Sequence, residues 1–519
     1  MVDPAAALPD RWLTDWQRSE RMPFYTRANA GEVLPDPASP LGWTLVFEKG
    51  LLPGWLRGLV DFGIYREGEL PMERPPVTGL FGGYFYINLS HCRVVAIRMG
   101  MTVEAFDAAL LGNAAGAPAY QPHPDDPCQE CSAKVAQTIG EILAASRFPQ
   151  IDADLEAILT RRRDRPDLAA LSEADLVAHA RSFLPALDNA FARHDYSTFG
   201  SAVGPAMLAE ACAGAGEPAA LLDLISGFGE VPSASPSWSL WRLSRLANAS
   251  PEVSALFDQG VAAVAEALPA AAEASVVRFA EALDGFLADF GQRGPNEWDI
   301  RAVSWEAGPD QVLALVDSMR HLPDENSPDA RHERLEATRT STAERIRGRL
   351  ADDASRSSFE GAMQSAARMI PLREKTKLIA VTTINEVRMA MRELGRRGVA
   401  AGYFAAPEDV MMLLESELDE YVKDPARFAQ VIAQRLPQYL ALFELEPPFI
   451  IDADPEPLSR WPRRARSCGE SAEAPGSTKA RPGSAWTCPR PWPSSRVRSS
   501  SRHSPTPPGR RCSSWRARS

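Results

Sequence analysis

Residues 172–195, SEADLVAHARSFLPALDNAFARHD, carry the pattern of an amphipathic helix. Ser172 is a favoured N-cap residue, and Asp175 falls in the first turn, where the helix dipole favours a negative charge. Large apolar residues then recur at helical spacing, at Leu176, Phe183, Leu184, Leu187 and Phe191. The stretch therefore predicts one helix with a buried face, and it places His194 near the end of that helix, where a histidine could stabilise the C-terminal dipole.

The same periodicity continues toward the C-terminus. One further helix is marked by Ile384, Val387, Met391 and Leu394, and we expect the glycines at 395, 398 and 402 to end it. Another is expected to begin at Pro407, because proline suits a first helical turn and Glu408 and Asp409 follow it. Its apolar positions are Val410, Leu413, Leu414, Leu418 and Tyr421.

The first hundred residues have a different character. Prolines interrupt short apolar pieces there, and GGYFYIN at 82–88 is the best strand candidate, with a turn signal before it. We therefore predict a mainly α protein with a multi-helix, bundle-like body, a small loop-rich and β N-terminal part, and a disordered C-terminal tail. The expected divisions are 1–100 (loop-rich), 101–320 (helical body), 321–360 (a charged linker or solvated helix), 361–455 (C-terminal helices) and 456–519 (basic tail).

The tail has an unusual composition. From 459 to 519 there is no Leu, Ile, Phe, Tyr, Met, Asp, Asn or Gln, and fourteen Lys or Arg stand against two Glu. Such a segment cannot bury enough apolar surface to offset the entropy of ordering. Two interpretations stay open: a disordered basic tail, or the out-of-frame product of a GC-rich gene in place of a folded domain after Asp454. A nucleic-acid-binding arm is disfavoured, because its cations are scattered among Pro and Ser.

Charge and hydropathy exclude several functional classes. Removing the tail's +12 from the total of -12 leaves about -24 for the body, which disfavours nucleic-acid binding. No basic, apolar leader opens the chain, and no stretch approaches the roughly 18 apolar residues of a membrane-spanning helix. We therefore expect a cytoplasmic protein without nucleic-acid or membrane partners. The four body cysteines are too few and too irregular for a disulfide framework.

Several motifs with possible chemistry are better explained as structure. Cys128 and Cys131, with His123 and the His91–Cys92 pair upstream, have plausible zinc-ligand spacing. A second compact pair is missing, so ordinary loop cysteines are the favoured interpretation and no metal is expected. No Walker-type phosphate loop is found, because Gly291-Gln-Arg-Gly294 lacks the Gly-Lys-Ser that would follow.

Two polar clusters are stronger candidates for a ligand site. Arg27, Asn29 and Glu32 surround a glycine in one loop. Arg293, Glu297 and Asp299 follow an apolar helix, where the arginine offers a fork for carboxylate or phosphate. The alternative is that each cluster is an ion-paired clamp between helices. If they bind a ligand, we expect the two clusters to meet at one cavity.

A family resemblance emerges from these residues. TRANAGEVLPDPASPLGWTL, FGGYFYINLS, FLADFGQRGPNEWDIRAVSWEAGPDQVLAL and MIPLREKTKL, followed by ELGRRGVAAGYFAAPEDVMML, resemble successive landmarks of the phosphoenolpyruvate-utilising enzymes, in particular the rifampicin phosphotransferase and phosphoenolpyruvate synthase-like branch. The likeness spans residues 20–455. It implies the helical, acceptor-binding region of a dikinase-type phosphotransferase, in which a nucleotide-binding domain phosphorylates a mobile histidine domain that serves the acceptor.

The resemblance also sets limits on what this chain can do alone. Neither the ATP-grasp domain nor the phosphohistidine domain is recognisable, and His503 lacks the glycines around the family's histidine. No catalytic residue is therefore assigned, and ATP and Mg²⁺ are expected only on missing or partner domains. Arg373 joins the two clusters as an expected substrate-binding residue, and a small molecule is the expected acceptor. The alternative is a non-catalytic binding or assembly protein that pairs with a separate ATP-grasp and phosphohistidine subunit.

Overall fold

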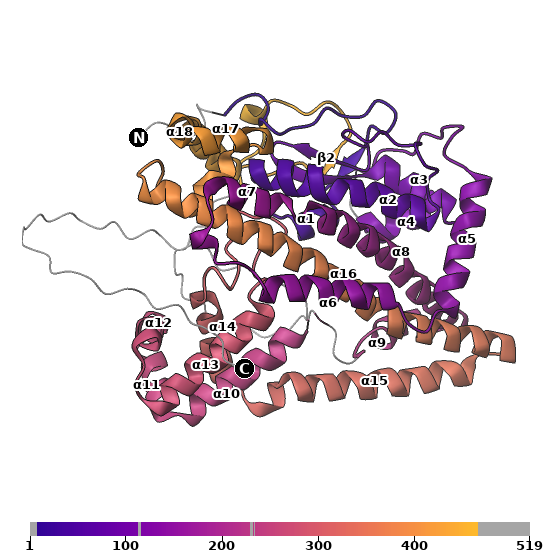
Figure 1. Cartoon of the computed structure of the whole chain (residues 1–519). Coiled ribbons are helices and arrows are strands. Elements are labelled where there is room, and N and C mark those ends of the chain that lie inside the picture. The colour runs from indigo at the N-terminus through magenta and orange to yellow at the C-terminus, as the bar shows by residue number, and fades with distance from the viewer. Residues whose placement is uncertain (1–7, 113–115, 229–231, 233, 465–519) are drawn as a thin grey trace, which may run out of the picture. The chain divides into compact units, whose positions relative to one another are not determined.

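Helices dominate the computed structural model of the chain, which describes residues 8–112, 116–228, 232 and 234–464 (Figure 1). The first half contains α1 (Ala30–Val33), α2 (Leu52–Phe62), α3 (Leu89–Arg98), α4 (Val103–Leu111), α5 (Gln129–Ala144), α6 (Pro149–Arg163), α7 (Glu173–Arg181), α8 (Leu184–Gly214) and α9 (Leu221–Leu224). The second half contains α10 (Ser235–Ala249), α11 (Pro251–Asp258), α12 (Val261–Ala267), α13 (Ala274–Phe290), α14 (Asp310–Arg320), α15 (Pro328–Arg349), α16 (Asp353–Ala400), α17 (Leu418–Lys423) and α18 (Pro425–Leu442). The predicted fold class, mainly α with a small N-terminal β part, is confirmed.

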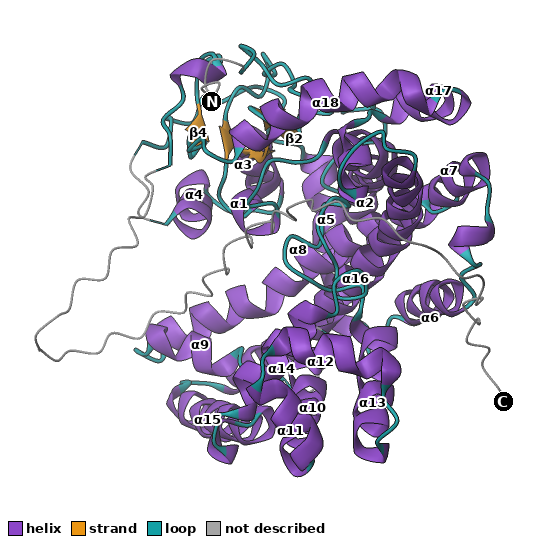
Figure 2. Cartoon of the chain, turned by 90° about the vertical axis from the view of Figure 1, so that its left-hand side faces the viewer, coloured by secondary structure: helices purple, strands orange, loops and turns teal. Residues whose placement is uncertain are grey.

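The strands form one small antiparallel sheet beside α3 and α18 (Figure 2). β2 (Thr78–Phe81) and β3 (Tyr84–Asn88) form a hairpin around Gly82 and Gly83, as the sequence predicts. β1 (Tyr25–Thr26) pairs with β3, and β4 (Ile450–Ile451) pairs with β1. The sheet therefore joins the N-terminal part to a segment more than 400 residues away in the chain.

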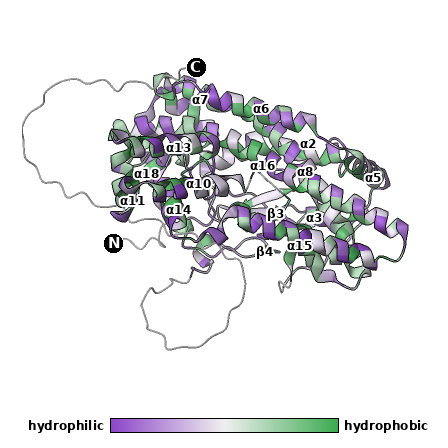
Figure 3. Ribbon diagram, turned by 90° about the horizontal axis from the view of Figure 1, so that it is seen from below, coloured by the Kyte–Doolittle hydropathy of each residue, from purple (hydrophilic) through white to green (hydrophobic). Residues whose placement is uncertain are grey.

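The long helices α8 and α16 pack along each other and form the centre of the body. Their buried faces belong to two hydrophobic clusters, one shared with the N-terminal part and one shared with α9 and α15. A third cluster lies among α10, α11, α12, α13 and α14. In Figure 3 the helices carry both hydrophilic and hydrophobic residues, as expected for helices with one face in a core.

The stretch 172–195 forms two helices rather than one. Ser172 caps α7 as predicted, since its Oγ accepts the backbone N–H of Asp175 at 3.1 Å. The chain then turns at Phe183, and α8 begins with Pro185 in its first turn, a position that needs no N–H donor. Because α8 runs on to Gly214, His194 lies inside the helix, and its predicted place near a helix C-terminus is wrong.

The glycines at 395 and 398 do not end the helix that contains them. α16 continues to Ala400, and only Gly402, with φ of 77°, lies beyond its end. Gly395 is instead a point of close approach, because a Cβ there would lie 1.9 Å from the carbonyl oxygen of Pro407. The helix expected from Pro407 is also divided, into a 3₁₀ helix at Pro407–Met412, another at Glu415–Glu417, and α17.

The charged segment 321–360 contains α15 and the start of α16. Most of α15 is exposed, and its buried residues are Thr342, Ala343 and Ile346. The boundary expected after residue 360 falls inside α16, which runs without interruption from Asp353. The division into 101–320, 321–360 and 361–455 stays a prediction.

The expected start of the tail at 456 is wrong. Leu458 and Trp461 are 2% and 5% exposed, and the Trp461 ring stacks on Tyr84 with centroids 6.5 Å apart. The backbone N–H of Glu446 donates to the carbonyl of Pro462 at 2.7 Å, and that of Arg464 donates to Glu444 at 2.8 Å. The packed chain therefore extends to 464, and the remainder of the predicted tail lies outside the described residues.

Cys128 and Cys131 form a disulfide at the beginning of α5, which corrects their interpretation as ordinary loop cysteines. His91, expected as a possible zinc ligand, is buried, and its Nδ1 lies 3.0 Å from the Tyr65 hydroxyl. No group of three or more His, Cys, Asp or Glu residues in the described ranges could hold a metal ion. Within those ranges, no helix is long and apolar enough to cross a bilayer.

Candidate functional site

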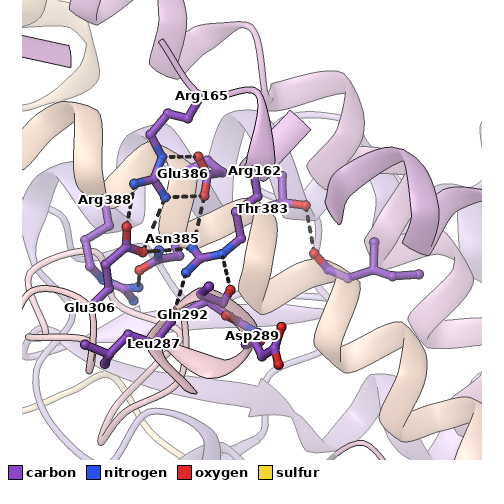
Figure 4. A network of polar contacts seen from close by, with 12 residues as sticks. Arg162, Arg165, Leu287, Asp289, Gln292, Glu306, Thr383, Asn385, Glu386 and Arg388 are labelled. Carbon is purple, nitrogen blue, oxygen red and sulfur yellow. Dashed lines mark hydrogen bonds and ion pairs between the residues drawn. The ribbon is translucent and has the colours of Figure 1, made fainter. Parts of the chain in front are cut away.

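A network of buried charges joins α6, α16 and the loop 291–309 (Figure 4). Glu386 of α16 is fully buried, and its carboxylate accepts hydrogen bonds from Arg165 at 2.6 and 2.7 Å and from Arg162 at 3.3 Å. Glu306 completes the square, with Arg162 at 2.8 Å and Arg165 at 2.5 Å. Two arginines and two glutamates thus balance one another, which offsets the cost of burying them.

The network continues along α16 and fixes the loop. Asn385 donates its Nδ2 hydrogen to Glu306 at 3.0 Å and accepts from Arg388 at 2.7 Å. Arg388 also donates to the carbonyl oxygens of Glu297 and Asp299, at 2.7 and 3.2 Å. A cation from the helix therefore satisfies the backbone of a loop that has no regular hydrogen-bonding pattern of its own.

Electrostatics keep this network ionised. Burial tends to raise the pKa of Glu306, but the hydrogen bonds from Arg165 and the charge of Arg162 outweigh it, so the pKa is lowered. Burial tends to lower the pKa of Arg165, and the bonds to Glu386 and Glu306 raise it overall. Burial lowers the pKa of Arg388 to about 10, which still leaves the guanidinium charged at neutral pH.

An open cleft of about 510 Å³ borders this network. Its charged walls come from the end of α6, the loop and α16, and the lining consists of Arg165, Pro166, Asp167, Leu168, Ala169, Glu306, Ala307, Met389, Arg392, Glu393, Arg396 and Pro407. The carboxylate of Glu393 is ionised, because hydrogen bonds from Arg396 lower its pKa despite partial burial. The cleft thus offers both carboxylates and guanidinium groups.

Arg392 has the most free hydrogen-bonding capacity in this cleft. Within the described residues it donates no hydrogen bond, and its ion-pair partner Glu408 lies 3.6 Å away. Its side chain is 17% exposed. A guanidinium without an acceptor can bind an anionic or carbonyl group of a ligand, while Glu306 and Glu393 can accept from ligand hydroxyls.

The first sequence-predicted cluster is spread over buried and exposed positions. The guanidinium of Arg27 is buried and donates to the carbonyls of Phe85, Leu34 and Pro35, at 2.6, 3.1 and 3.2 Å. Asn29, with φ of 58°, and Glu32 are exposed at the start of α1. Arg27 thus links the backbone of β3 to the segment that follows α1.

The second cluster is an ion-paired loop. Arg293 binds Glu297 at 2.7 Å, and Lys377 approaches the same carboxylate at 3.1 Å. Asp299 is 2% exposed, and its carboxylate accepts from the N–H and the Oγ of Ser39, both at 2.6 Å. Arg373 lies exposed on α16.

Asp299 of the second cluster contacts Ser39, which lies 260 residues away in the chain and does not belong to the first cluster. Burial raises the pKa of Asp36, on which the charges of Arg464, Asp299 and Arg27 also act. This contact is buried rather than open, and none of the seven predicted residues lines the cleft at Arg392. Arg27 and Arg293 therefore have different partners, and the expectation that the two clusters meet at one cavity stays a prediction.

Sequence reasoning missed the residues that form the network and the cleft. A signal exists for two of them, because Glu386 and Arg388 interrupt an otherwise apolar helical segment around Ile384 and Val387. A charged residue on a buried helix face needs a partner of opposite charge. Which residues supply those partners, namely Arg162, Arg165 and Glu306, depends on contacts that span more than 70 residues.

The predicted histidines have structural surroundings. His194 lies between α8 and α16, with its Nδ1 3.1 Å from the Thr376 hydroxyl, and burial lowers its pKa to about 3. Its neighbour Asp195 is 7% exposed, and burial raises its pKa. His194 is therefore neutral at neutral pH, and burial favours the neutral form of Asp195 as well, which suits the packed contact between the two long helices.

Comparison with known proteins connects this architecture to a family. Residues 194–374 match the family described as the rifampicin phosphotransferase fourth domain. The match begins within α8, contains α9 to α15 and the loop 291–309, and ends within α16. It therefore covers the elements between the two central helices together with the loop that holds the buried charges.

Curated relatives match a similarly limited part of the chain. Uncharacterized proteins of Mycobacterium tuberculosis and Mycobacterium bovis are 27% identical to it over 168 residues. That segment is 32% of this chain and 17% of each relative, so the chain matches only a small part of their length. Over residues 194–374, the chain thus contains a region similar to the rifampicin phosphotransferase fourth domain, which belongs to the phosphoenolpyruvate-utilising enzyme family.

Proposed function

We propose that this chain is the acceptor-binding part of a phosphoenolpyruvate synthase-like, dikinase-type phosphotransferase that works in the cytoplasm. The match of residues 194–374 to the rifampicin phosphotransferase fourth domain carries this proposal. The cleft at Arg392 supports it, because the cleft combines the guanidinium of Arg392, whose side chain is 17% exposed, with two ionised carboxylates. A small molecule with hydroxyl groups and an anionic or carbonyl group suits that combination.

Each cleft residue has a distinct role in this proposal. Arg392 binds the polar or anionic end of the acceptor, while Glu306 and Glu393 accept from its hydroxyl groups and orient them. The predicted residues Arg293, Glu297 and Asp299 position the loop that carries Glu306. Asn29, Glu32 and Arg373 are exposed and remain expected contacts for the acceptor, whereas the buried Arg27 would act by holding the loop that carries Asn29 and Glu32.

The phosphoryl donor would come from elsewhere. A partner domain or subunit would supply ATP, Mg²⁺ and a phosphorylated histidine, and this chain would hold the acceptor in position for transfer. Proximity and orientation are the main contributions that a binding domain can make to such a reaction. In the alternative, the chain is a non-catalytic ligand-binding or assembly protein that pairs with a separate ATP-grasp subunit.

A thermal-shift panel of hydroxylated small molecules, with rifampicin included, tests the acceptor site. We expect at least one compound to raise the unfolding midpoint of the intact protein, and Arg392→Ala to weaken its binding about tenfold or more. Arg356→Ala is the matched control, because Arg356 is an exposed arginine of the same helix paired with Asp353. Equal binding by the wild type and Arg392→Ala, or no binding at all, would contradict the proposal.

An assay with radiolabelled ATP tests whether the phosphoryl group comes from a partner subunit and not from this chain. We expect the purified chain alone to form no acid-labile phosphoprotein and to transfer no phosphate to a bound compound. Adding an ATP-grasp and phosphohistidine subunit of this family should restore transfer to the compound found in the panel. Phosphorylation of any histidine by the chain alone would show that it needs no such partner.

A further inference from the structure

The disulfide at the start of α5 has the arrangement of an exchangeable cysteine pair. Cys128 and Cys131 are separated by two residues, which is the spacing of redox-active Cys-X-X-Cys motifs. Cys128 is the N-cap of α5 and half-buried, whereas Cys131, in the first turn, is 2% exposed. An incoming thiol would thus find one sulfur more accessible than the other.

The local structure stabilises a negative charge on Cys128. The backbone N–H of Cys131 donates to the Cys128 Sγ at 3.2 Å. The 16-residue helix α5 also directs the positive end of its dipole toward Cys128, its N-cap residue. Glu130, the acidic side chain of that turn, opposes the effect, but the N–H makes a direct contact. A sulfur held in this way is a good leaving and attacking group in thiol exchange.

We propose that Cys128 and Cys131 form a redox-active centre that exchanges with dithiols. A thiolate of the dithiol attacks Cys128 Sγ, the bond to Cys131 breaks, and Cys131 leaves as a thiolate that takes up a proton. The second thiol of the dithiol then attacks the mixed disulfide and releases Cys128. The cysteine pair gains two electrons and two protons, and the dithiol becomes a disulfide.

The other described cysteines differ from this pair. Cys92 is free, and burial raises its pKa to about 12, so it stays a thiol at neutral pH. Cys212 is free and buried in the cluster shared by α8, α9, α15 and α16, and burial raises its pKa as well. They provide internal controls for reactivity in the same molecule.

The loop before Cys128 links the centre to the N-terminal part. Asp126 accepts from Arg21 and from the Tyr120 hydroxyl, and its backbone oxygen accepts from Arg98 at 2.9 Å. These residues, Arg98 excepted, line a cleft of about 470 Å³. A change of oxidation state at Cys128 therefore occurs two residues from the wall of a cleft.

Mass spectrometry of the full chain tests the proposal directly. Trypsin releases residues 99–134 as a fragment that contains Cys128 and Cys131 and no other cysteine. After treatment of the native protein with dithiothreitol, we expect this fragment to gain two alkyl groups, and after oxidised glutathione to gain none. The circular dichroism spectrum should be the same for the reduced and the oxidised protein.

A Cys131→Ser variant tests the reactivity of the remaining sulfur. At neutral pH, Cys128 should be alkylated about tenfold or more faster than Cys92, because the thiolate is the reactive form. A disulfide that resists dithiothreitol in the native protein would identify a purely structural crosslink and overturn the proposal. Two thiols that persist in oxidised glutathione, or equal rates at Cys128 and Cys92, would also overturn it.

Discussion

At the scale of single residues, Glu386 is the central acceptor of the buried charge network. It is fully buried and accepts from both Arg162 and Arg165. Glu386→Ala would leave two arginines short of a partner, so the free energy of unfolding should fall by about 3–5 kcal/mol. Chemical denaturation measures this change.

The matched control for Glu386→Ala is Glu156→Gln. Glu156 pairs with Arg163 at 2.7 Å, but both side chains are exposed, at 69% and 60%. Water screens such a pair, so this variant should unfold like the wild type. Equal effects of the two substitutions would show that burial does not set the strength of the network.

The buried histidine His91 should contribute to the dependence of stability on pH. Burial, with a contribution from the charge of Arg98, lowers the pKa of His91 to about 3. In the unfolded chain the pKa is near 6.5, so only the unfolded state gains a proton as the pH falls below that value. The contribution of His91 to the free energy of unfolding is therefore complete above about pH 6.5 and is lost progressively toward about pH 3.

Denaturation of the wild type and His91→Asn at pH 7 and pH 5 measures this contribution. One and a half pH units below the unfolded pKa correspond to about 2 kcal/mol of lost stability. The wild type should lose about this much more than the variant between the two pH values. An identical loss in both proteins would show that His91 is protonated in the folded state.

At the scale of elements, the packing of Pro407 against α16 requires a glycine at position 395. A Cβ on Gly395 would meet the carbonyl oxygen of Pro407 at 1.9 Å, a backbone atom that cannot rotate away. Gly395→Ala should therefore lower the free energy of unfolding by about 1–3 kcal/mol, even though alanine favours helices. Thermal unfolding is a sufficient measurement.

Gly140→Ala provides the comparison for Gly395→Ala. Gly140 lies inside α5, and a Cβ there would meet nothing within 4 Å. Alanine should therefore stabilise the helix by about 0.5–1 kcal/mol. If both substitutions stabilised the protein, the close approach of Pro407 to α16 would be ruled out.

At the scale of the whole molecule, the chain as far as 464 behaves as one packed unit, and two shortened proteins test its limit. A chain ending at Arg464 should keep the unfolding midpoint of the full protein, because residues 465–519 offer almost no large aliphatic side chains. A chain ending at Glu456 loses Leu458 and Trp461, which are both buried. It should be less stable by about 3–5 kcal/mol.

Trp461→Ala in the full chain distinguishes the effect of losing this one side chain from the effect of removing the whole segment after Glu456. It removes the ring that stacks on Tyr84 and should reproduce most of the loss seen on ending the chain at Glu456. An unchanged midpoint in both variants would mean that residues 457–464 do not stabilise the body.

The amino-acid sequence by itself determined the helical character of the predicted stretches and the hairpin, but not where each helix ends. The Ser172 cap, the apolar spacing of α7, α8 and α16, and the paired glycines before β3 depend on neighbours within a few residues, so local chemistry is sufficient. The resemblance also pointed to the family that matches residues 194–374. Of the candidate site, sequence reasoning identified the loop 291–299 but not the cleft beside it.

Only the tertiary structure decided where the charged and glycine residues act. Whether Arg27 faces a ligand or a backbone carbonyl, whether Gly395 ends a helix or admits Pro407, and whether Trp461 packs on Tyr84 depend on partners far away in the chain. The same applies to Glu386, whose arginines lie more than 200 residues before it. Such pairs leave no periodic pattern, because the partners are distant in the chain and meet only through tertiary contacts.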